Sequence, residues 1–223
     1  MGHVDFINKL LSDIKWEKQK VTPHKDIPLS QLKLETNEWK SANNVACVFV
    51  DLENSTQLAT GDIQNAMQIF SIYGDSLVRI FKFYKAHYID IQGDGGFALF
   101  DGKYSFKKAY YTAIAANFVF NVYLKLQIRM KVRIGVDMGN IIAKKVGIRG
   151  VNKEVWLGNP VNIACKLCNL KNINIGNIRI SKSFFYKLPC NHKKYFRPSL
   201  TKFHPSGIYS IIYSSNNAHL ANY

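Results

Sequence analysis

Two aspartates have the type and the spacing to do chemistry together. Asp51 follows the apolar run VACVFV, and Asp94 lies in the glycine-rich segment 93–96. Carboxylates bind hard divalent cations, together with backbone carbonyl oxygens, water and substrate phosphates. Two such ions about 3.5–4 Å apart can activate an attacking oxygen and neutralise a leaving group. We therefore take Asp51, Asp94 and the backbone carbonyl of Leu52 as candidate metal ligands.

A second group of polar side chains follows the first aspartate directly. Asn54, Ser55 and Thr56 lead into a segment that reads as a helix. Backbone N–H groups in the first turn of a helix bind anions, so we expect these residues to contact a triphosphate. Taken singly, an aspartate after a strand is commonly a helix cap, and G-D-G-G is commonly a turn. Together, the two aspartates are a stronger indication of a metal site than either alone, because the order of elements in the chain predicts that they lie close to each other.

An amide and a lysine four residues apart form the third candidate feature. Asn162 and Lys166 lie in an apolar segment that begins at Pro160, a residue type that favours the first turn of a helix. Residues four apart share one helical face. The amide could orient a ribose, and the lysine could stabilise negative charge on a phosphate. The alternative is a helix that merely begins at Pro160 and leaves Lys166 in solvent.

The elements that must position these side chains follow from the apolar pattern. Residues 45–52 form a continuous apolar run, typical of a buried central strand. Helices are predicted over residues 61–86 and 105–125, and YIDI and FALF flank QGDGG as in a β-hairpin. Further strands are predicted at KVRIGVDMG, IRIS and IYSIIYS, with a helix from 160 to about 169 between the first two.

The resulting order is β-α-β-β-α-β. It predicts an α+β fold with a ferredoxin-like core, in which helices cover one face of an antiparallel sheet. The first strand and the hairpin are neighbours in this topology, so Asp51 and Asp94 converge. Ahead of the core, residues 3–17 have the spacing of an amphipathic helix, and residues 18–41 read as a linker. We therefore divide the chain into an N-terminal helix and linker (1–41), a catalytic domain (42–215) and a tail (216–223).

The composition limits the classes of protein that need considering. The chain has 223 residues, of which 47% are hydrophobic and 20% charged, so it is too apolar for a disordered protein. No apolar run approaches the roughly 18 residues of a membrane span, and the N-terminus is too charged for a secretory signal. We expect a cytoplasmic protein with its four cysteines reduced. The net charge of +15 suits an anionic partner, or simply reflects a solvated lysine-rich surface.

Four motifs give the sequence a family resemblance. VFVDLENST, IQGDGGFALF, VRIGVDMGN and WLGNPVNIACKL, in this order and spacing, resemble the catalytic domain of class III nucleotide cyclases over about residues 44–185. The resemblance implies a homodimer with shared active sites, in which Asp51 and Asp94 hold two Mg²⁺ or Mn²⁺ ions and Asn162 of the partner subunit positions the ribose. It also implies in-line attack of a 3′-hydroxyl on the α-phosphate, which releases pyrophosphate and a 3′,5′-cyclic nucleotide. Such a reaction depends mostly on positioning and charge stabilisation.

Three positions depart from the family pattern and bear on the substrate. Asp90 and Val155 occupy the two base-reading positions, with Glu154 in place of Val155 if the loop carries one extra residue. A carboxylate at 90 can accept a hydrogen bond from uracil N3–H, the cytosine amino group, or guanine N1–H and N2–H, but it cannot donate one to adenine N1. Lys166 stands where most of the family has an arginine that stabilises the transition state. A lysine keeps the charge but loses the forked geometry of the guanidinium.

Among class III cyclases, the sequence is most similar to the pyrimidine cyclases of Pycsar antiphage defence. A single catalytic domain without a recognisable sensor and the motif W-x-G-x-P-V-N-x-A-x-K-L carry this similarity. It implies a cyclase that converts UTP, slightly favoured over CTP, to a cyclic nucleotide on phage infection. A separate effector protein would respond to that messenger, and no stable nucleic-acid or membrane partner is expected.

Three other functions are left open by the sequence. The first is a purine cyclase, which would share the fold and the metal site. The second is a catalytically inactive relative that binds nucleotide or only dimerises, although the presence of Asp51, Asp94 and Asn162 argues against it. The third is a polymerase-like palm that binds nucleic acid. That function would leave the motif from Trp156 to Leu167 unexplained.

Overall fold

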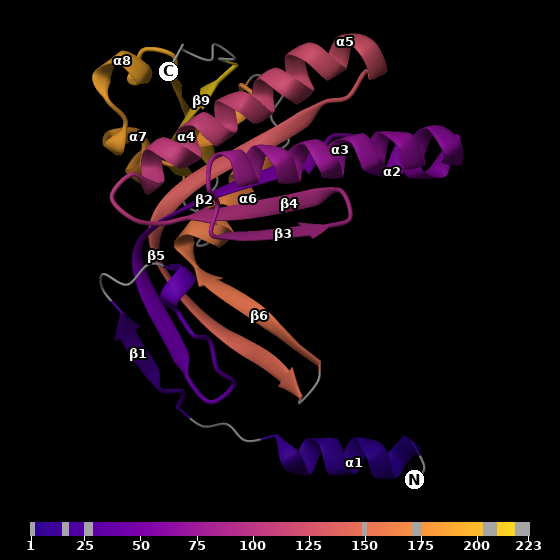
Figure 1. Ribbon diagram of the computed structural model, residues 1–223, viewed down its shortest axis with the longest axis vertical. Coiled ribbons are helices and arrows are strands. Elements are labelled where there is room, and N and C mark those ends of the chain that lie inside the picture. The colour runs from indigo at the N-terminus through magenta and orange to yellow at the C-terminus, as the bar shows by residue number, and fades with distance from the viewer. Residues whose placement is uncertain are drawn as a thin grey trace.

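One mixed β-sheet organises the part of the chain that the structure describes, which is residues 3–14, 18–24, 29–148, 151–170, 175–202 and 209–216 of a computed structural model (Figure 1). Its strands run in the order β3-β4-β2-β5-β7-β9-β8, with β1 paired to β2 and β6 paired to β5. The strands are β1 (Val21–His24), β2 (Trp39–Leu52), β3 (Tyr88–Gln92), β4 (Gly95–Phe100), β5 (Val132–Ile148), β6 (Val151–Gly158), β7 (Ile178–Ile180), β8 (Arg197–Lys202) and β9 (Tyr209–Ser215).

Helices connect these strands. They are α1 (His3–Asp13), the 3-10 helix η1 (Leu29–Gln31), α2 (Ser55–Thr60), α3 (Ile63–Phe83), α4 (Ser105–Ala116), the π-helical η2 (Asn117–Tyr123), α5 (Leu124–Ile128), α6 (Asn159–Cys168), α7 (Lys182–Lys187) and α8 (Cys190–Lys193). The helix predicted over 61–86 is α3, and Asp62 caps it by accepting hydrogen bonds from the backbone N–H groups of Gln64 and Asn65. No helix within the described residues is both long and apolar enough to cross a membrane.

The four central strands have the order that a ferredoxin-like core requires. β2 lies between β4 and β5 and is antiparallel to both, while β3 pairs with β4 at the edge. Alternate side chains of β2 and β5 point toward α3 and α4, where they form the larger hydrophobic cluster. Its buried members include Val48, Val50, Leu77 and Phe120. The predicted α+β fold class and core order are confirmed.

The structure differs from the prediction because helices cover both faces of the sheet and not one. α6 packs on the face opposite α3 and α4, in a second cluster that contains Val45, Cys47 and Ala164. Its close approach depends on Gly135, because a Cβ atom there would lie 1.9 Å from the carbonyl oxygen of Ala164. A strand that is apolar on both faces, as residues 45–50 are, needs cover on both. The sheet is also not purely antiparallel, since β1 runs parallel to β2 and β7 parallel to β5.

The stretch expected to be a linker is partly built into the sheet. β1 lies within it and pairs with the start of β2. Leu29 and Leu34 are buried in the second cluster, and the Leu29 N–H donates to the carboxylate of Asp101. The sequence pattern did not predict β1 because the strand contains Pro23, and proline is depleted from strands and tolerated only at edges and ends. The amphipathic helix ahead of it, α1, has its apolar residues exposed.

Candidate active site

Asp51 and Asp94 come together at one end of the sheet. Asp51 is the penultimate residue of β2 and is paired with Gly95 of β4, while Asp94 lies in the short turn between β3 and β4. The backbone N–H of Leu52 donates to the carbonyl oxygen of Asp94 at 3.0 Å, which ties the turn to β2. A cavity of about 240 Å³ opens beside the two carboxylates, lined by Phe49, Asp51, Asp90, Gln92, Asp94, Gly95, Gly96, Phe97 and Asn169. We call it the catalytic cavity.

A basic residue that the sequence analysis did not single out holds Asp51. Arg133 is the pairing partner of Asp51 across β2 and β5, and its Nη2 lies 2.7 Å from Oδ2 of Asp51. Burial raises the pKa of the Asp51 carboxyl against the opposing effect of Arg133, and the charges of Asp94 and Glu53 raise it further. The cavity therefore concentrates more negative charge than one arginine balances, which suits a cation site.

The three polar residues after the first carboxylate take different positions. Ser55, the first residue of α2, donates a hydrogen bond from its hydroxyl to Oδ2 of Asp94. Asn54 precedes the helix in a left-handed conformation with φ 59°, and its side chain makes no cap hydrogen bond. Asn54 and Thr56 are both exposed. Ser55 thus belongs to the carboxylate site, whereas its two neighbours lie beside it.

The donor set suits hard divalent cations that are held in part by a substrate. Asp51 and Asp94 line one cavity, but no group of three or more His, Cys, Asp or Glu side chains that could hold a metal occurs among the described residues. Mg²⁺ is commonly bound through one or two carboxylates, with phosphate oxygens and water completing its shell. The residues present fit that mode of binding and do not form a closed protein cage.

Asp90 lines the same cavity from β3. Its Oδ2 accepts a hydrogen bond of 2.8 Å from Nε2 of Gln92, two residues further along the strand. From the cavity, four aromatic rings continue across this face of the sheet, and we call them the aromatic row. Neighbouring ring centroids in the row lie 6.2, 5.7 and 4.9 Å apart, in the order Phe49, Phe97, Tyr88 and Trp156. Such rings offer flat faces on which a planar base can stack.

Of the two residues expected at the second base-reading position, Glu154 rather than Val155 lies on the face of β6 that meets the aromatic row. Glu154 and Trp156 are two residues apart on β6 and share a face, so Val155 lies on the reverse face. Burial raises the pKa of the Tyr88 hydroxyl, and the charges of Asp90 and Glu154 raise it further. Both carboxylates therefore lie close enough to Tyr88 to act on its hydroxyl.

The fourth motif lies on α6, and the structure keeps its candidates out of the catalytic cavity. Asn162 and Lys166 are exposed on the outer face of α6. Asn169, the residue that follows the helix, lines the cavity instead. The exposure of Asn162 and Lys166 leaves both side chains available to a second molecule.

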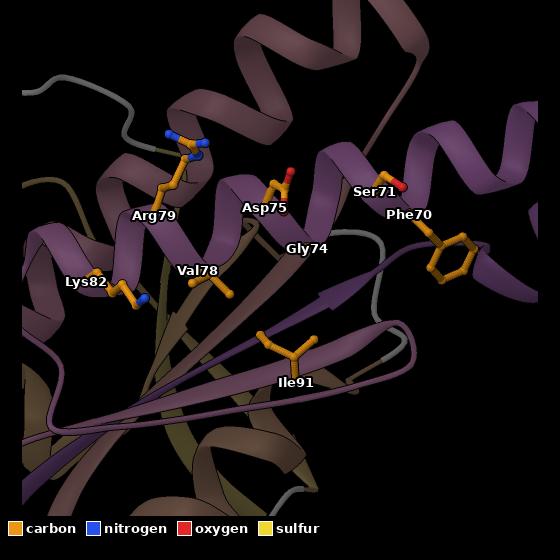
Figure 2. Close-up of a pocket in the computed structure, with 8 residues that line it drawn as sticks. All are labelled: Phe70, Ser71, Gly74, Asp75, Val78, Arg79, Lys82 and Ile91. Atoms are coloured by element: carbon orange, nitrogen blue, oxygen red, sulfur yellow. The ribbon is translucent and has the colours of Figure 1, made fainter.

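A larger groove of about 490 Å³ lies between α3 and β3 (Figure 2). Val78 and Ile91 face each other across it, while Asp75 and Arg79 point away from the strand (Figure 2). Ile91 stands between Asp90 and Gln92 in the sequence of β3, so its side chain lies on the opposite face from theirs. The groove shares no lining residue with the catalytic cavity.

Solved cyclase structures have the same fold. The catalytic core of a rhodopsin-guanylyl cyclase with converted specificity, in complex with ATPαS, has a TM-score of 0.66 at 17% identity, over 81% of this chain and 99% of that chain. The adenylyl cyclase CyaB from P. aeruginosa has a TM-score of 0.65 at 18% identity, over 79% of this chain and 95% of that chain. At these identities the likeness shows the fold alone.

The family follows from the sequence match. The family model of the adenylate and guanylate cyclase catalytic domain matches residues 38–197. The chain therefore belongs to this family, as the four motifs predict. Class III cyclases are in general dependent on divalent metals, in agreement with the donor set described above.

Three curated relatives of the chain are uridylate cyclases. A uridylate cyclase of Propioniciclava tarda is 31% identical over 144 residues, which are 59% of this chain and 46% of that protein. A uridylate cyclase of Micromonospora echinofusca is 29% identical over 154 residues, which are 63% and 50% of the two chains. A uridylate cyclase of Burkholderia cepacia is 27% identical over 166 residues, which are 70% and 71%. The chain spans about half the length of the first two relatives.

Proposed function

We propose that this chain is a nucleotide cyclase that converts a pyrimidine nucleoside triphosphate to its 3′,5′-cyclic nucleotide and pyrophosphate. The observation that carries the proposal is the catalytic cavity, where Asp51 and Asp94 lie together with Asp90. Membership of the cyclase family supports the reaction class. The uridylate cyclases among its relatives support the substrate class, with UTP slightly favoured over CTP.

The residues around the triphosphate bind and orient. Asp51 and Asp94 hold two divalent cations, Mg²⁺ or Mn²⁺, whose chemistry when bound is to neutralise phosphate charge and to activate the 3′-hydroxyl. The backbone carbonyl of Leu52 is a further candidate ligand. Ser55 fixes the Asp94 carboxylate, and Arg133 fixes that of Asp51. Asn54 and Thr56, exposed at the start of α2, contact the phosphate chain.

Recognition of the base falls to β3 and the aromatic row. The carboxylate of Asp90, oriented by Gln92, accepts a hydrogen bond from uracil N3–H or from the cytosine amino group. Adenine N1 needs a donor, which a carboxylate at this position does not provide. The base stacks on the rings nearest the cavity, Phe49 and Phe97. Glu154 takes the second base-reading role in preference to Val155, because it shares a face with the row.

Two copies of the chain complete each active site. Asn162 of the partner subunit orients the ribose, and the partner subunit's Lys166 stabilises charge at the phosphorus. The exposure of both residues on α6 supports this arrangement. The catalytic domain is residues 42–215, after an N-terminal part of 1–41, and most of the tail (217–223) lies outside the described residues.

The cyclic nucleotide serves as a second messenger in antiphage defence, in the cytoplasm, and a separate effector protein responds to it. The similarity to pyrimidine cyclases of that defence system, carried by the motif from Trp156 to Leu167, supports this role. The reaction itself requires neither a nucleic acid nor a membrane.

A product assay tests the proposal. Purified protein is incubated with Mn²⁺ and each of the four NTPs separately, and the products are resolved by mass spectrometry. Cyclic UMP or cyclic CMP is expected, and Asp94→Ala should abolish it. Cyclic GMP as the product would keep the carboxylate site but reassign Asp90 to guanine. No cyclic product from any NTP, with and without lysate of phage-infected cells, would contradict the proposal.

A further inference from the structure

A second cavity lies on the α3–α4 side of the sheet, between α4 and the segment that joins α7 to α8. Its volume is about 310 Å³, and its lining includes Lys107, Tyr110, Tyr111, Leu188, Asn191 and His192. α7 and α8 lie at the end of the sheet away from the β3–β4 turn (Figure 1). The cavity shares no lining residue with the catalytic cavity.

The cavity is apolar and aromatic at its floor and polar at its mouth. Tyr110, Tyr111 and Leu188 are 4%, 9% and 3% exposed, so they form the floor. Lys107 and Asn191 are exposed and stand at the rim. A guest that enters therefore meets an ammonium and an amide first and aromatic rings further in.

The rings of the floor are set at different angles. The His192 ring lies 4.5 Å from that of Tyr110 at 40°, and 5.8 Å from that of Tyr111 at 89°. The two tyrosine rings meet edge to face at 5.0 Å. The Tyr111 hydroxyl lies 3.3 Å from Nε2 of His192, which fixes the imidazole. The floor is therefore a set of aromatic rings held by contacts with one another, and a further planar ring would meet the small part of each that remains exposed.

The charge at the cavity is positive. No carboxylate lines it, and Lys107 makes no salt bridge within the described residues. The Lys107 ammonium lies 5.9 Å from the centre of the Tyr111 ring. Burial lowers the pKa of His192, and the charge of Lys107 lowers it further. The positive charge is therefore that of Lys107, and an anion bound at the mouth would interact favourably with its ammonium group.

We propose that this cavity binds a planar aromatic anion no larger than a nucleoside monophosphate. Its ring would rest on the tyrosine floor, and its negative group would pair with Lys107 at the mouth. The volume lies at the lower end of the range for small-molecule sites. Cyclic nucleotides belong to this chemical class, and the identification of the enzyme's own product as the ligand rests on the function proposed above.

Isothermal titration of the full chain with added cyclic UMP tests the proposal. EDTA is present, so that nucleotide does not bind through metal in the catalytic cavity. Uridine, which lacks the charge, and inorganic phosphate, which lacks the ring, should each bind at least tenfold more weakly. Lys107→Ala should weaken binding of cyclic UMP about tenfold, the equivalent of about 1.4 kcal/mol. Lys103→Ala, which removes a charge outside the lining, is the matched control and should leave the affinity unchanged.

A second variant protects the test against folding artefacts. Asn191→Trp places a large ring at the exposed rim, and it should block binding without lowering the melting temperature. Equal binding by wild type, Lys107→Ala and Asn191→Trp would overturn the proposal, and so would the absence of binding by cyclic UMP, cyclic AMP and 5′-UMP at millimolar concentration. Cyclic UMP is added in this experiment, so its binding does not depend on cyclase activity. If the protein binds cyclic UMP but makes no cyclic nucleotide, the cavity remains a site for an aromatic anion, and only the identification of the ligand as the enzyme's own product is lost.

Discussion

The two carboxylates of the catalytic cavity are held by different kinds of partner. Asp51 faces the guanidinium of Arg133, a cation that competes with any metal for its charge. Asp94 accepts from the neutral hydroxyl of Ser55, which orients the carboxylate and leaves its full charge available. The orientation of Asp94 therefore depends on an uncharged side chain, and that of Asp51 on a charged one.

The change Ser55→Ala removes that hydroxyl and retains the backbone of α2. Loss of a hydrogen bond to a charged group costs about 1.5–3 kcal/mol. We expect the Mn²⁺ concentration for half-maximal activity to rise about tenfold or more. A titration of initial rate against Mn²⁺ measures it. Thr60→Ala, at the exposed last residue of the same helix, is the matched control, and equal shifts in both variants would contradict the role given to Ser55.

Asp101 is a buried carboxylate outside the catalytic cavity, 5% exposed. Its Oδ1 lies 2.7 Å from Nδ1 of His87, and its Oδ2 accepts from the Leu29 N–H. Burial opposes ionisation, but these hydrogen bonds and the charge of Lys108 outweigh it and hold the pKa of Asp101 below its usual value. A lowered pKa stabilises the fold above the unfolded pKa of about 3.9, and this contribution is lost as the pH falls through the folded value.

Asp101→Asn should therefore lower the free energy of unfolding at pH 7 by about 1–3 kcal/mol. The difference from wild type should shrink below about pH 4. Urea denaturation at pH 7 and at pH 3.5 measures both effects. Asp75→Asn, at an exposed position on α3, serves as the control. A difference that is the same at both pH values would sink the assignment.

That Asp51 and Asp94 lie together could be predicted from the sequence because each stands beside a strong local pattern, an apolar strand or a glycine-rich turn, whereas Asp90 was singled out by its place in the family pattern. Arg133 could not, because it meets Asp51 across 82 residues and only the register of β2 and β5 brings them together. The choice between Val155 and Glu154, which the sequence left open, could not be predicted for a similar reason. Which residue of β6 faces the aromatic row depends on strand pairing, and a register step of one residue reverses every side chain.

At the scale of elements, a buried arginine closes the end of α6. Arg179, 4% exposed, donates from Nη1 to the carbonyl oxygens of Leu167, Cys168 and Leu170 at 3.0, 2.9 and 2.6 Å. Burial lowers the pKa of its guanidinium. The last carbonyls of a helix have no partner within the helix, so Arg179 supplies the donors that α6 lacks.

Arg179→Met should destabilise the protein by roughly 3–5 kcal/mol, because it removes the guanidinium that donates to the carbonyls of Cys168 and Leu170 and leaves the Leu167 carbonyl with backbone donors alone. Arg179→Lys should recover only part of the loss, since an ammonium lacks the planar set of donors. Thermal and urea unfolding measure the effect. Arg197→Met, at an exposed position on β8, should change stability by less than about 0.5 kcal/mol. Equal losses at both positions would rule out the capping role.

The contact of α6 with β5 can be tested with a pair of glycines. Gly135→Ala forces a Cβ atom to within 1.9 Å of the Ala164 carbonyl oxygen, whereas a Cβ atom at Gly74 meets nothing within 4 Å. We expect Gly135→Ala to lose at least about 2 kcal/mol of stability and most of its activity as α6 is pushed from the sheet. Gly74→Ala, in the interior of α3, should gain about 0.5–1 kcal/mol. Urea unfolding and the cyclase assay measure both, and a tolerated Gly135→Ala would show that α6 can move away without cost.

Most elements could be predicted from the sequence because their periodicity is local. The apolar run predicts β2, the glycine-rich turn predicts the hairpin of β3 and β4, and the helical spacing predicts α3, α4 and α6. The order of these elements then predicts the ferredoxin-like core. β1 was not predicted, because Pro23 interrupts its pattern and its pairing partner begins at Trp39. The position of α6, on the face of the sheet opposite α3 and α4, was not predicted either, because only the three-dimensional packing shows which side of β2 a later helix covers.

At the scale of the whole molecule, the proposed sharing of active sites predicts complementation between two inactive variants. Asp94→Ala and Asn162→Ala break different halves of one site. When they are mixed and allowed to exchange subunits, half of the dimers contain one intact site, so activity should return to about a quarter of wild type. Cyclic nucleotide production by the mixture, compared with each variant alone, measures it.

The control mixture combines Asp94→Ala with Asp51→Ala. Both residues lie in the same cavity of one chain, so every site in a mixed dimer lacks one carboxylate and no activity should return. Recovery in this mixture, or none in the first, would show that the sites are not shared in the proposed way.

In mechanical terms, the N-terminal segment is held at two points, the pairing of β1 with β2 and the carboxylate of Asp101. One carboxylate oxygen holds the Leu29 N–H and the other holds His87, the residue directly before Tyr88 of β3. Tension applied through α1 and β1 reaches the start of β2 first, because β1 pairs with it, and tension that passes on to Leu29 reaches the strand that carries Asp90. A pull on the N-terminus would therefore act on two of the strands that line the catalytic cavity, β2 and β3.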